Sequence, residues 1–351
     1  MPGKIRIGIL GAGGIVGAHA PGFAAMADRC EVVAVAEPNP ARAGRIRELF
    51  GGQVRIEPDY RQVVAAPDVD AVDILLPHDM HLPATVAAAA ARRPVLIEKV
   101  MARSVAECDA MIAACARADV PLVVCHDRRY EPHWRALKRV VDSGALGDIH
   151  FWKLEHNQDV AVGPDHWIFS RERLGGGAVM SCLTHQIDAL RWMGGEARTV
   201  TGMTKVIPTR MEGETVGALV AEMASGALAQ LSINWFTRSP WCENGLWYEL
   251  VHVSGSRGEA YFLSGRGTFV RLHEGDLGPV GPCEAPAGEG FARVIPDEAC
   301  TGHVRCIREW VRMLRGEPHE VVTWGQDSRR TVAFAEAAYR AVETRRFVAV
   351  M

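Results

Sequence analysis

The sequence predicts an α/β protein with two domains: a doubly wound parallel sheet, then an α+β domain with a large, mostly antiparallel open sheet. Three observations support this. At about 150 residues per domain, 351 residues correspond to roughly two domains. Apolar strands alternate with helices over the first third of the chain, as in parallel βαβ units. After about residue 148, strands joined by short glycine turns dominate. We therefore expect domains over 1–126 and 127–351.

Five strands and four helices are expected in the first domain. The strands are continuous apolar runs, which is typical of strands buried on both faces, at Lys4–Leu10, Glu31–Ala36, Ala71–Leu76, Val95–Ile97 and Leu122–Cys125. The helices are expected at Val16–Ala27, Pro40–Phe50, Leu82–Ala91 and Ser104–Ala118. Pro40 near a helix start, Gly51 after its end and Ser104 as an N-cap set three of these limits.

The second domain is predicted to be rich in strands. They are expected at Ile149–Glu155, Val200–Val206, Val216–Met223, Ala227–Phe236, Tyr248–Ser254, Glu259–Leu263 and Phe269–His273. Helices are expected at Gly177–Met193, His303–Arg315 and Gln326–Thr344. The segment Gly275–Gly290 is rich in glycine and proline and is expected to be a surface loop.

Composition excludes several classes of protein. Apolar residues make up 48% and charged residues 23%, as in an ordinary soluble globular protein, and the net charge is −3. No excess of positive charge exists to bind nucleic acid or an anionic membrane. The nine cysteines contain no C-x-x-C pair, which argues against zinc-ribbon and thioredoxin-type motifs and favours reduced thiols in a cytoplasmic protein.

The N-terminal segment has some features of a secretory signal peptide. Lys4 and Arg6 precede Ile7–Ala27, which holds no formally charged residue. Its six glycines and Pro21 make a poor signal core. A nucleotide-binding turn explains these glycines better.

A glycine-rich turn follows the first predicted strand: Gly11, Ala12, Gly13, Gly14, Ile15 and Val16. Gly11 suits a tight turn, and Gly13 lets the backbone approach a pyrophosphate at a helix N-terminus. The third glycine of the dinucleotide fingerprint is replaced by Val16, so a flavodoxin-like sheet with an incidental glycine turn remains an alternative.

An acidic residue ends the second predicted strand. The carboxylate of Glu37 can accept hydrogen bonds from the ribose hydroxyls of adenosine, and it would repel a 2′-phosphate. This favours NAD over NADP as the cofactor. Arg42, one helical turn further on, weakens that preference.

Polar residues follow three other predicted strands, at the edge of the sheet where ligands bind in open α/β proteins. Residues expected to contact the cofactor there are Leu76, Pro77, His78, His81, Glu98, Lys99 and Arg128. Lys99 directly follows a buried strand, and an amino group beside apolar walls and a cationic nicotinamide suits proton transfer. A solvated lysine paired with Glu98 is the alternative.

A second polar group is predicted in the other domain. The run Gly175–Gly177 leads into a helix in which His185 and Asp188 are three residues apart and share a face, so the carboxylate can orient the imidazole. A structural histidine is the alternative. Residues expected around a substrate are Lys99, His126, His156, His166, Trp167, Ser181 and His185. We expect no metal site, because neither H-E-x-x-H nor a pair of cysteine ligands occurs.

The whole chain, from Ile5 to about Val350, resembles the Gfo/Idh/MocA family of oxidoreductases, named after glucose–fructose oxidoreductase and inositol dehydrogenase. The resemblance rests on Gly11–Ile15, Glu37, Pro77-x-x-x-His81, Glu98-Lys99, Arg129-Tyr130, Gly175–Gly177, His185-x-x-Asp188 and the strand–turn Val253–Gly258. It implies an N-terminal Rossmann domain and a C-terminal domain whose open sheet makes dimer or tetramer contacts. It also implies oxidation of a secondary alcohol of a sugar, glycoside or cyclitol, or the reverse reduction.

The resemblance also implies roles for residues. Lys99 matches the family's lysine near the substrate hydroxyl and the nicotinamide, and His185 matches its proton acceptor. The chain departs from the family at four places: Val100 replaces a proline, Ser181 replaces an aspartate, Leu183 stands where glycine is common, and His78 follows Pro77 where a Pro-Asn pair is commoner. These departures leave the acid–base assignment and the substrate open.

We therefore expect a cytoplasmic, NAD-dependent dehydrogenase in which Lys99, His185 and Asp188 are catalytic. Its expected partner is a carbohydrate-like small-molecule substrate, and we expect no binding to nucleic acid or membrane. The protein is expected to form a homodimer or homotetramer through its C-terminal sheet. Two alternatives stay open. One is redox-neutral glycoside cleavage or epimerisation with tightly bound NAD, and the other is a non-catalytic NAD-binding regulator.

Overall fold

The computed structural model describes residues 3–238, 247–284 and 290–350 and divides the chain into two compact units. The first unit runs to Tyr130 and includes Cys300–Arg329; the second comprises Glu131–Ala299 and the residues from Arg330 onward. The predicted boundary after residue 126 lies close to the observed one. The predicted division assigned 300–329 to the second domain, whereas in the structure this segment packs with the first unit.

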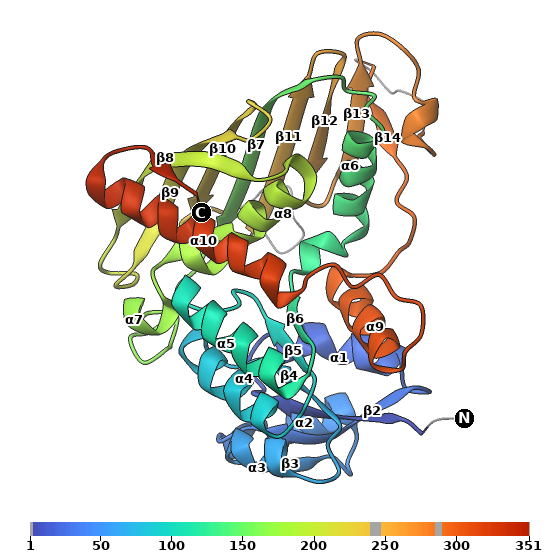
Figure 1. Cartoon of the computed structure of the whole chain (residues 1–351), viewed down its shortest axis with the longest axis vertical. Coiled ribbons are helices and arrows are strands. Elements are labelled where there is room, and N and C mark those ends of the chain that lie inside the picture. The colour runs from blue at the N-terminus through green and yellow to red at the C-terminus, as the bar shows by residue number, and fades with distance from the viewer. Residues whose placement is uncertain (1–2, 239–246, 285–289, 351) are drawn as a thin grey trace. The chain divides into compact units, whose positions relative to one another are not determined.

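The first unit contains a six-stranded parallel sheet in the order β3-β2-β1-β4-β5-β6 (Figure 1). Its strands are β1 (Ile5–Leu10), β2 (Cys30–Ala36), β3 (Arg55–Glu57), β4 (Ala71–Ile74), β5 (Val95–Glu98) and β6 (Leu122–Cys125). This is the strand order of dinucleotide-binding folds and differs from the flavodoxin order. The order reverses between β1 and β4, so their carboxyl ends flank the expected ligand crevice.

Helices cover this sheet, and short 3₁₀ turns follow several strands. They are α1 (Val16–Ala25), η1 (Pro40–Arg42), α2 (Ala43–Phe50), α3 (Tyr60–Ala65), η2 (His78–Met80), α4 (His81–Ala90), α5 (Val105–Ala118), η3 (Asp127–Arg129) and α9 (Gly302–Leu314). α1 packs against α9, and α4 packs against α5. A Cβ at Gly22 of α1 would lie 2.7 Å from Ile307 Cδ1 of α9, so glycine allows this close contact.

The second unit contains a nine-stranded sheet in the order β14-β13-β12-β11-β7-β10-β9-β8-β15. Its strands are β7 (Ile149–Gln158), β8 (Ala197–Val206), β9 (Glu214–Met223), β10 (Leu228–Asn234), β11 (Trp247–Gly255), β12 (Gly258–Leu263), β13 (Gly267–Leu272), β14 (Ala292–Val294) and β15 (Val348–Ala349). Only the β7–β10 pair is parallel among these described strands. The predicted fold class is confirmed.

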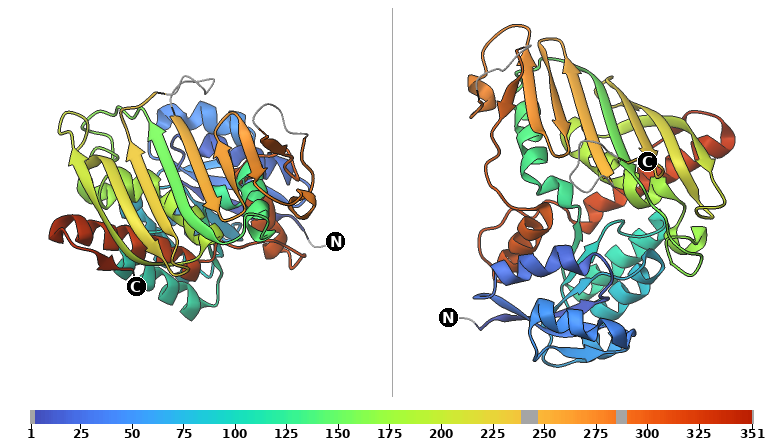
Figure 2. Two further views of the ribbon diagram at one scale, coloured as in Figure 1. Left: turned by 90° about the horizontal axis from the view of Figure 1, so that it is seen from above. Right: turned by 180° about the vertical axis from the view of Figure 1, so that it is seen from behind.

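Helices lie on one face of this second sheet. They include α6 (Pro132–Asp142), α7 (Arg171–Leu174), the π-helical turn η4 (Val179–Leu183), α8 (Thr184–Gly194) and α10 (Gly325–Thr344), with η5 (Gly278–Val280) a single 3₁₀ turn. Figure 2 shows the other face uncovered within this unit. The burial of β9 alternates accordingly: Leu219 and Ala221 are buried, whereas Val220 is 44% exposed.

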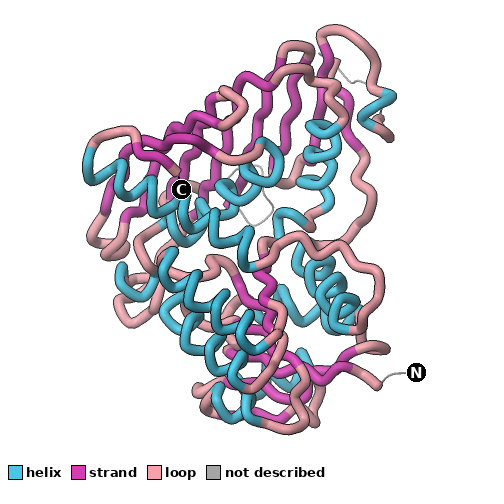
Figure 3. The backbone as a smooth tube through the Cα atoms, viewed as in Figure 1, coloured by secondary structure: helices cyan, strands magenta, loops and turns pink. Residues whose placement is uncertain are grey.

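The predicted elements agree with the structure to within a few residues, apart from three differences (Figure 3). The elements β3, α3, α6, α7, β14 and β15 were not predicted. The predicted helix Gly177–Met193 is divided by the π-helical turn. The predicted loop Gly275–Gly290 contains η5, and residues 285–289 lie outside the described residues. The eight cysteines within the described ranges are all free thiols.

Candidate active site

The glycine-rich turn lies at the carboxyl end of β1. Gly11 adopts φ +98°, a left-handed conformation that favours glycine, and its N–H donates to the Ala36 carbonyl at 3.0 Å. A Cβ at this position would lie 2.7 Å from the Leu75 carbonyl oxygen. Only glycine therefore lets β1 turn here so close to the end of β4.

The rest of the turn leaves space for an anionic ligand. A Cβ built on Gly13 or Gly14 meets no atom within 4 Å, so the backbone is open there. α1 then begins after Ile15 with no side-chain cap and no acidic residue in its first turn, and Val16 is fully buried. An uncapped helix N-terminus of this kind attracts a pyrophosphate.

Glu37 directly follows β2, the strand next to β1. It is only 5% exposed, yet one carboxylate oxygen accepts from the N–H of Asn39 and the other from Arg42, both at 2.9 Å. A carboxylate has about four acceptor positions, so each oxygen keeps one for a ribose hydroxyl. Arg42 thus orients Glu37 and also brings positive charge beside it.

His81 fixes the segment that follows β4. It is fully buried, with Nδ1 2.9 Å from the Val100 carbonyl oxygen and Nε2 2.9 Å from that of Leu76. Burial lowers the pKa of His81. The ring joins the ends of two neighbouring strands and therefore acts as a positioning residue. His78, also buried, packs against it, and Pro77 precedes η2.

Glu98 and Lys99 lie where β5 ends. The Lys99 N–H donates to Glu98 Oε2 at 3.1 Å, and His19 lies 2.9 Å from Glu98 Oε1. The peptide bond between Lys99 and Val100 is cis, and Val100 is fully buried. The Lys99 side chain is partly exposed, at the same edge of the sheet as the glycine-rich turn.

The residues after β6 lie at the same edge. His126 is buried, and the next turn, η3, pairs Arg128 with Asp127. Arg129 forms an ion pair of 2.6 Å with Asp327, which anchors the turn to the later segment of the first unit.

In the second unit, two histidines stack. The rings of His156 on β7 and His185 on α8 are 5.9 Å apart and nearly parallel. Glu249 on β11 accepts from both His156 Nδ1 (3.1 Å) and Gln186 Nε2 (2.8 Å). Burial alone would lower the pKa of His156, but hydrogen bonds with Cys182 and Glu249 outweigh it and raise that pKa to about 9. We call His156, His185, Gln186 and Glu249 the histidine cluster.

The π-helical turn borders this cluster. Ser181 and Cys182 belong to it, and the Cys182 thiol lies 3.9 Å from Gln158 Oε1, which in turn is 3.4 Å from His156 Nε2. π-Helical turns are rare and frequently occur at functional sites. The buried Ser181 therefore lies beside polar groups, and its predicted contact with a substrate stays a prediction.

Asp188 is fully buried and accepts from the Thr331 hydroxyl at 3.0 Å. Arg191 lies 3.8 Å from the same carboxylate oxygen and donates to Thr331 at 2.8 Å. The Asp188 carboxylate is thus part of a buried hydrogen-bonded network that connects α8 with α10. Its predicted role in orienting His185 stays a prediction.

His166 and Trp167 lie on the loop between β7 and α7. Their rings are 6.1 Å apart, His166 is exposed and Trp167 is partly exposed. Among the described residues, sequence reasoning missed Gln158, Gln186 and Glu249 around the histidines. The sequence does contain a signal for Glu249, because it is a charged residue within the apolar run that forms β11.

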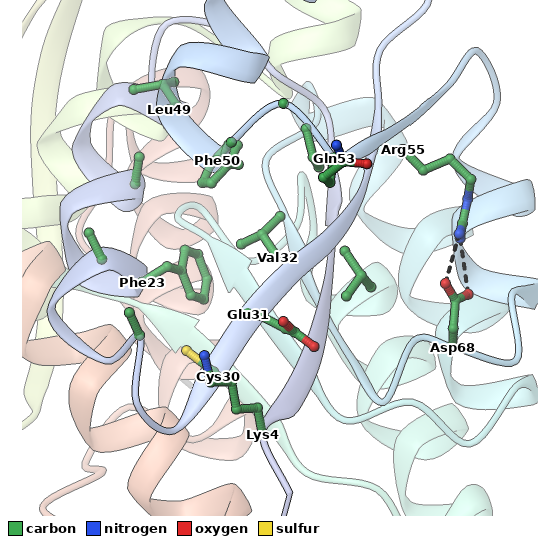
Figure 4. A pocket seen from close by; sticks show the side chains of 17 residues that line it. Lys4, Phe23, Cys30, Glu31, Val32, Leu49, Phe50, Gln53, Arg55 and Asp68 are labelled. Carbon is green, nitrogen blue, oxygen red and sulfur yellow. Dashed lines mark hydrogen bonds and ion pairs between the residues drawn. The ribbon is translucent and has the colours of Figure 1, made fainter.

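The first unit also contains a hollow of about 550 Å³ (Figure 4). Apolar side chains, including Phe23, Val32 and Phe50, line it, and Arg55 and Asp68 form a 2.7 Å ion pair at its side. It lies beside the amino-terminal half of β2, so it is separate from the glycine-rich turn.

Comparison with known proteins identifies the family. Residues 5–126 match the model of an oxidoreductase family with an NAD-binding Rossmann fold, and residues 134–261 match a GFO/IDH/MocA C-terminal domain. The chain belongs to the Gfo/Idh/MocA oxidoreductase family. The predicted family and the predicted cofactor NAD are thereby confirmed. The residues present fit NAD, because open glycines and an uncapped helix face the position of the pyrophosphate and Glu37 keeps acceptor positions for ribose.

Relatives in this family are named as sugar and cyclitol dehydrogenases. The chain is 26% identical to a D-apiose dehydrogenase of Rhizobium rhizogenes, over 90% of this chain and 89% of that one. It is 25% identical to an inositol 2-dehydrogenase of Rhizobium meliloti over 99% of both. A solved levoglucosan dehydrogenase in complex with NADH and L-sorbose has the same fold, with a TM-score of 0.86, 20% identity and full coverage of both chains. Of the described helices, none is long and apolar enough to cross a bilayer.

Proposed function

We propose that this family member is an NAD-dependent dehydrogenase that oxidises a secondary alcohol of a sugar, glycoside or cyclitol, or catalyses the reverse reduction. The observation that carries the proposal is the shared sheet edge. The glycine-rich turn, Glu37 and Lys99 all follow carboxyl ends of strands in one parallel sheet, where such folds bind dinucleotides. The names of the relatives support the substrate class.

In the proposed reaction, Lys99 and His185 have different roles. Bound NAD supplies the hydride acceptor. We assign to Lys99 the task of polarising the substrate oxygen, because its ammonium group follows a rigid buried strand and is partly exposed. His185 takes the hydroxyl proton, and its stacked neighbour His156 is held by Glu249. General acid–base groups of this kind contribute about 10²–10⁴ in rate.

Most of the residues that we assign to substrate binding belong to the second unit. His156, Ser181 and His185 are buried polar residues of one unit, and Trp167 offers an apolar ring face suited to a sugar. His126 and His166 are assigned to the same substrate. Arg128, His78 and Leu76 are assigned to the cofactor.

We also propose that the enzyme is cytoplasmic and forms a homodimer or homotetramer through the uncovered face of the second sheet. Met203 is 80% exposed, Leu228 52% and Val220 44% on its neighbouring strands β8, β10 and β9. Apolar side chains gathered on a bare sheet face favour association with a second copy.

The test is NADH formation by purified enzyme with NAD, and separately with NADP, against a panel of sugars, glycosides and inositols. NADH formation with one substrate class and a preference for NAD is the expected result. If the protein binds NAD but forms no NADH with any member, the proposal fails. Mass spectrometry of the products then distinguishes redox-neutral cleavage or epimerisation, which changes the substrate, from a regulator, which leaves it intact.

A further inference from the structure

A second group of chemically capable side chains lies within the first unit. His19 on α1, Glu98 at the end of β5, Cys125 at the end of β6 and His303 on α9 each offer one ligand atom, and these atoms all lie within 4.8 Å of one another. The first three residues are buried, and His303 is partly exposed. We propose that these four side chains form a binding site for one divalent transition metal ion, with Zn²⁺ as the preferred ion.

The two histidines are oriented as metal ligands usually are. The Nε2 atoms of both rings face Glu98 Oε1, at 2.9 Å for His19 and 3.5 Å for His303. The opposite nitrogen of each ring faces a different carboxylate. Histidines that ligate a metal almost always direct their second ring nitrogen to a carboxylate, carbonyl or water.

Those outer carboxylates lie on β4 and on the turn that follows β6. His19 Nδ1 lies 2.8 Å from Asp73 Oδ2 of β4, and His303 Nδ1 lies 3.6 Å from Asp127 Oδ2 of η3. The geometry therefore contains two carboxylate–histidine pairs that converge on one point.

The donor set selects the class of ion. Two imidazoles, one thiolate and one carboxylate match a four-coordinate zinc site, whereas Mg²⁺ and Ca²⁺ prefer oxygen ligands alone. A divalent ion would offset the negative charge of Glu98 and of the thiolate that Cys125 forms on coordination. All four ligands come from helices or strand ends of one packed unit, so the site is held rigidly.

The inferred role is structural. Four protein ligands leave no open position for substrate, as in structural zinc sites. Glu98 Oε2 accepts from the Lys99 N–H, so a metal on Oε1 would hold the backbone of the lysine assigned to catalysis. Local spacing predicted no metal because the four ligands lie between residues 19 and 303 and only the fold brings them together.

The alternative is a hydrogen-bonded network without a metal. In that case His19, as an imidazolium, donates to both Asp73 and Glu98, and His303 lies beside them. The two interpretations predict opposite results for metal binding, and metal binding is measured without NAD or substrate. The test is therefore independent of the proposed dehydrogenase activity.

The experiment uses full-length protein stripped with a chelator, then dialysed against Zn²⁺ or Co²⁺. We expect one equivalent of zinc per chain by elemental analysis. Bound Co²⁺ should give tetrahedral d–d bands and a thiolate-to-metal charge-transfer band. Cys125→Ser should lose the charge-transfer band. Cys115→Ser, at a buried cysteine of the same unit that is not among the four ligands, should keep it.

His303→Gln is the second variant, chosen because its side chain is partly exposed and the fold should tolerate it. It should weaken Zn²⁺ binding by more than the roughly 10–100-fold that loss of an outer-shell partner costs. Failure of the folded wild-type protein to bind stoichiometric zinc would overturn the proposal in favour of the network. Unchanged affinity in His303→Gln, or a charge-transfer band that persists in Cys125→Ser, would overturn it as well.

Discussion

Replacing Glu249 with glutamine should reduce the pH dependence that the histidine cluster gives to stability. The pKa of His156 is raised from an ordinary 6.5 to about 9 although the ring is buried. At about 1.4 kcal/mol per unit, that difference of about 2.5 units corresponds to at most roughly 3.5 kcal/mol of folding free energy. Glutamine keeps the shape and an acceptor oxygen for Gln186 but loses the charge that favours the imidazolium.

The direction of the effect follows from proton linkage. Because the folded protein holds the proton on His156 more tightly than the unfolded chain, the stabilisation is complete below about pH 6.5 and is lost as pH rises through about 9. In Glu249→Gln the pKa of His156 should fall, since the contacts with Cys182 are then left to offset the effect of burial without the carboxylate. The variant should therefore be less stable at pH 6 and lose less stability between pH 6 and 9.

Two measurements check this. Histidine NMR, with His156→Asn to assign the resonance, gives the pKa directly, and urea unfolding from pH 6 to pH 9 gives the stability profile. Glu274→Gln, at an exposed position after β13, is the matched control. A His156 resonance that still titrates near pH 9 in Glu249→Gln would refute the reasoning.

Three further predictions concern the cofactor turn and the sheet. Gly11→Ala should cost about 1–3 kcal/mol of stability and weaken NAD binding in calorimetry, because φ +98° and the Leu75 carbonyl exclude a Cβ; unchanged binding would contradict this. Glu37→Ala should weaken NAD binding by about 10- to 100-fold and raise the relative use of NADP, as expected from losing hydrogen bonds to a charged group; an unaltered NAD-to-NADP ratio would count against its ribose role. Light scattering should find an oligomer that Met203→Glu combined with Leu228→Glu converts to a monomer, whereas a monomeric wild type would refute the sheet interface.

Strands and most helices could be predicted because their signals are local. The parallel strands read as short apolar runs, and Ser104 and Gly51 mark helix limits that the structure reproduces. The helix α6 was missed although Pro132 at its start and its amphipathic pattern were visible. The return of Cys300–Arg329 to the first unit depends on long-range packing such as that of Gly22 against Ile307, and no local pattern encodes it.

Residues of the candidate site also differ in whether a local sequence pattern or only the folded structure reveals them. The glycine-rich turn and Glu37 were predictable because their spacing along the chain is itself the functional pattern. Glu249 was not, since a single charged residue in a strand gains its meaning only from the register that places it opposite His156. His303 reaches Glu98 only through the packing of α9 on α1.

The most direct test of the central claim is turnover by Lys99→Ala with the substrate identified from the panel, measured as NADH formation. Lys4→Ala, at an exposed position just before β1, serves as the control. The account predicts that Lys99→Ala loses about 10²–10⁴ in kcat while its Kd for NAD stays at the wild-type value, and that the control keeps full activity. Wild-type turnover by Lys99→Ala would contradict the assignment of Lys99 to the reaction.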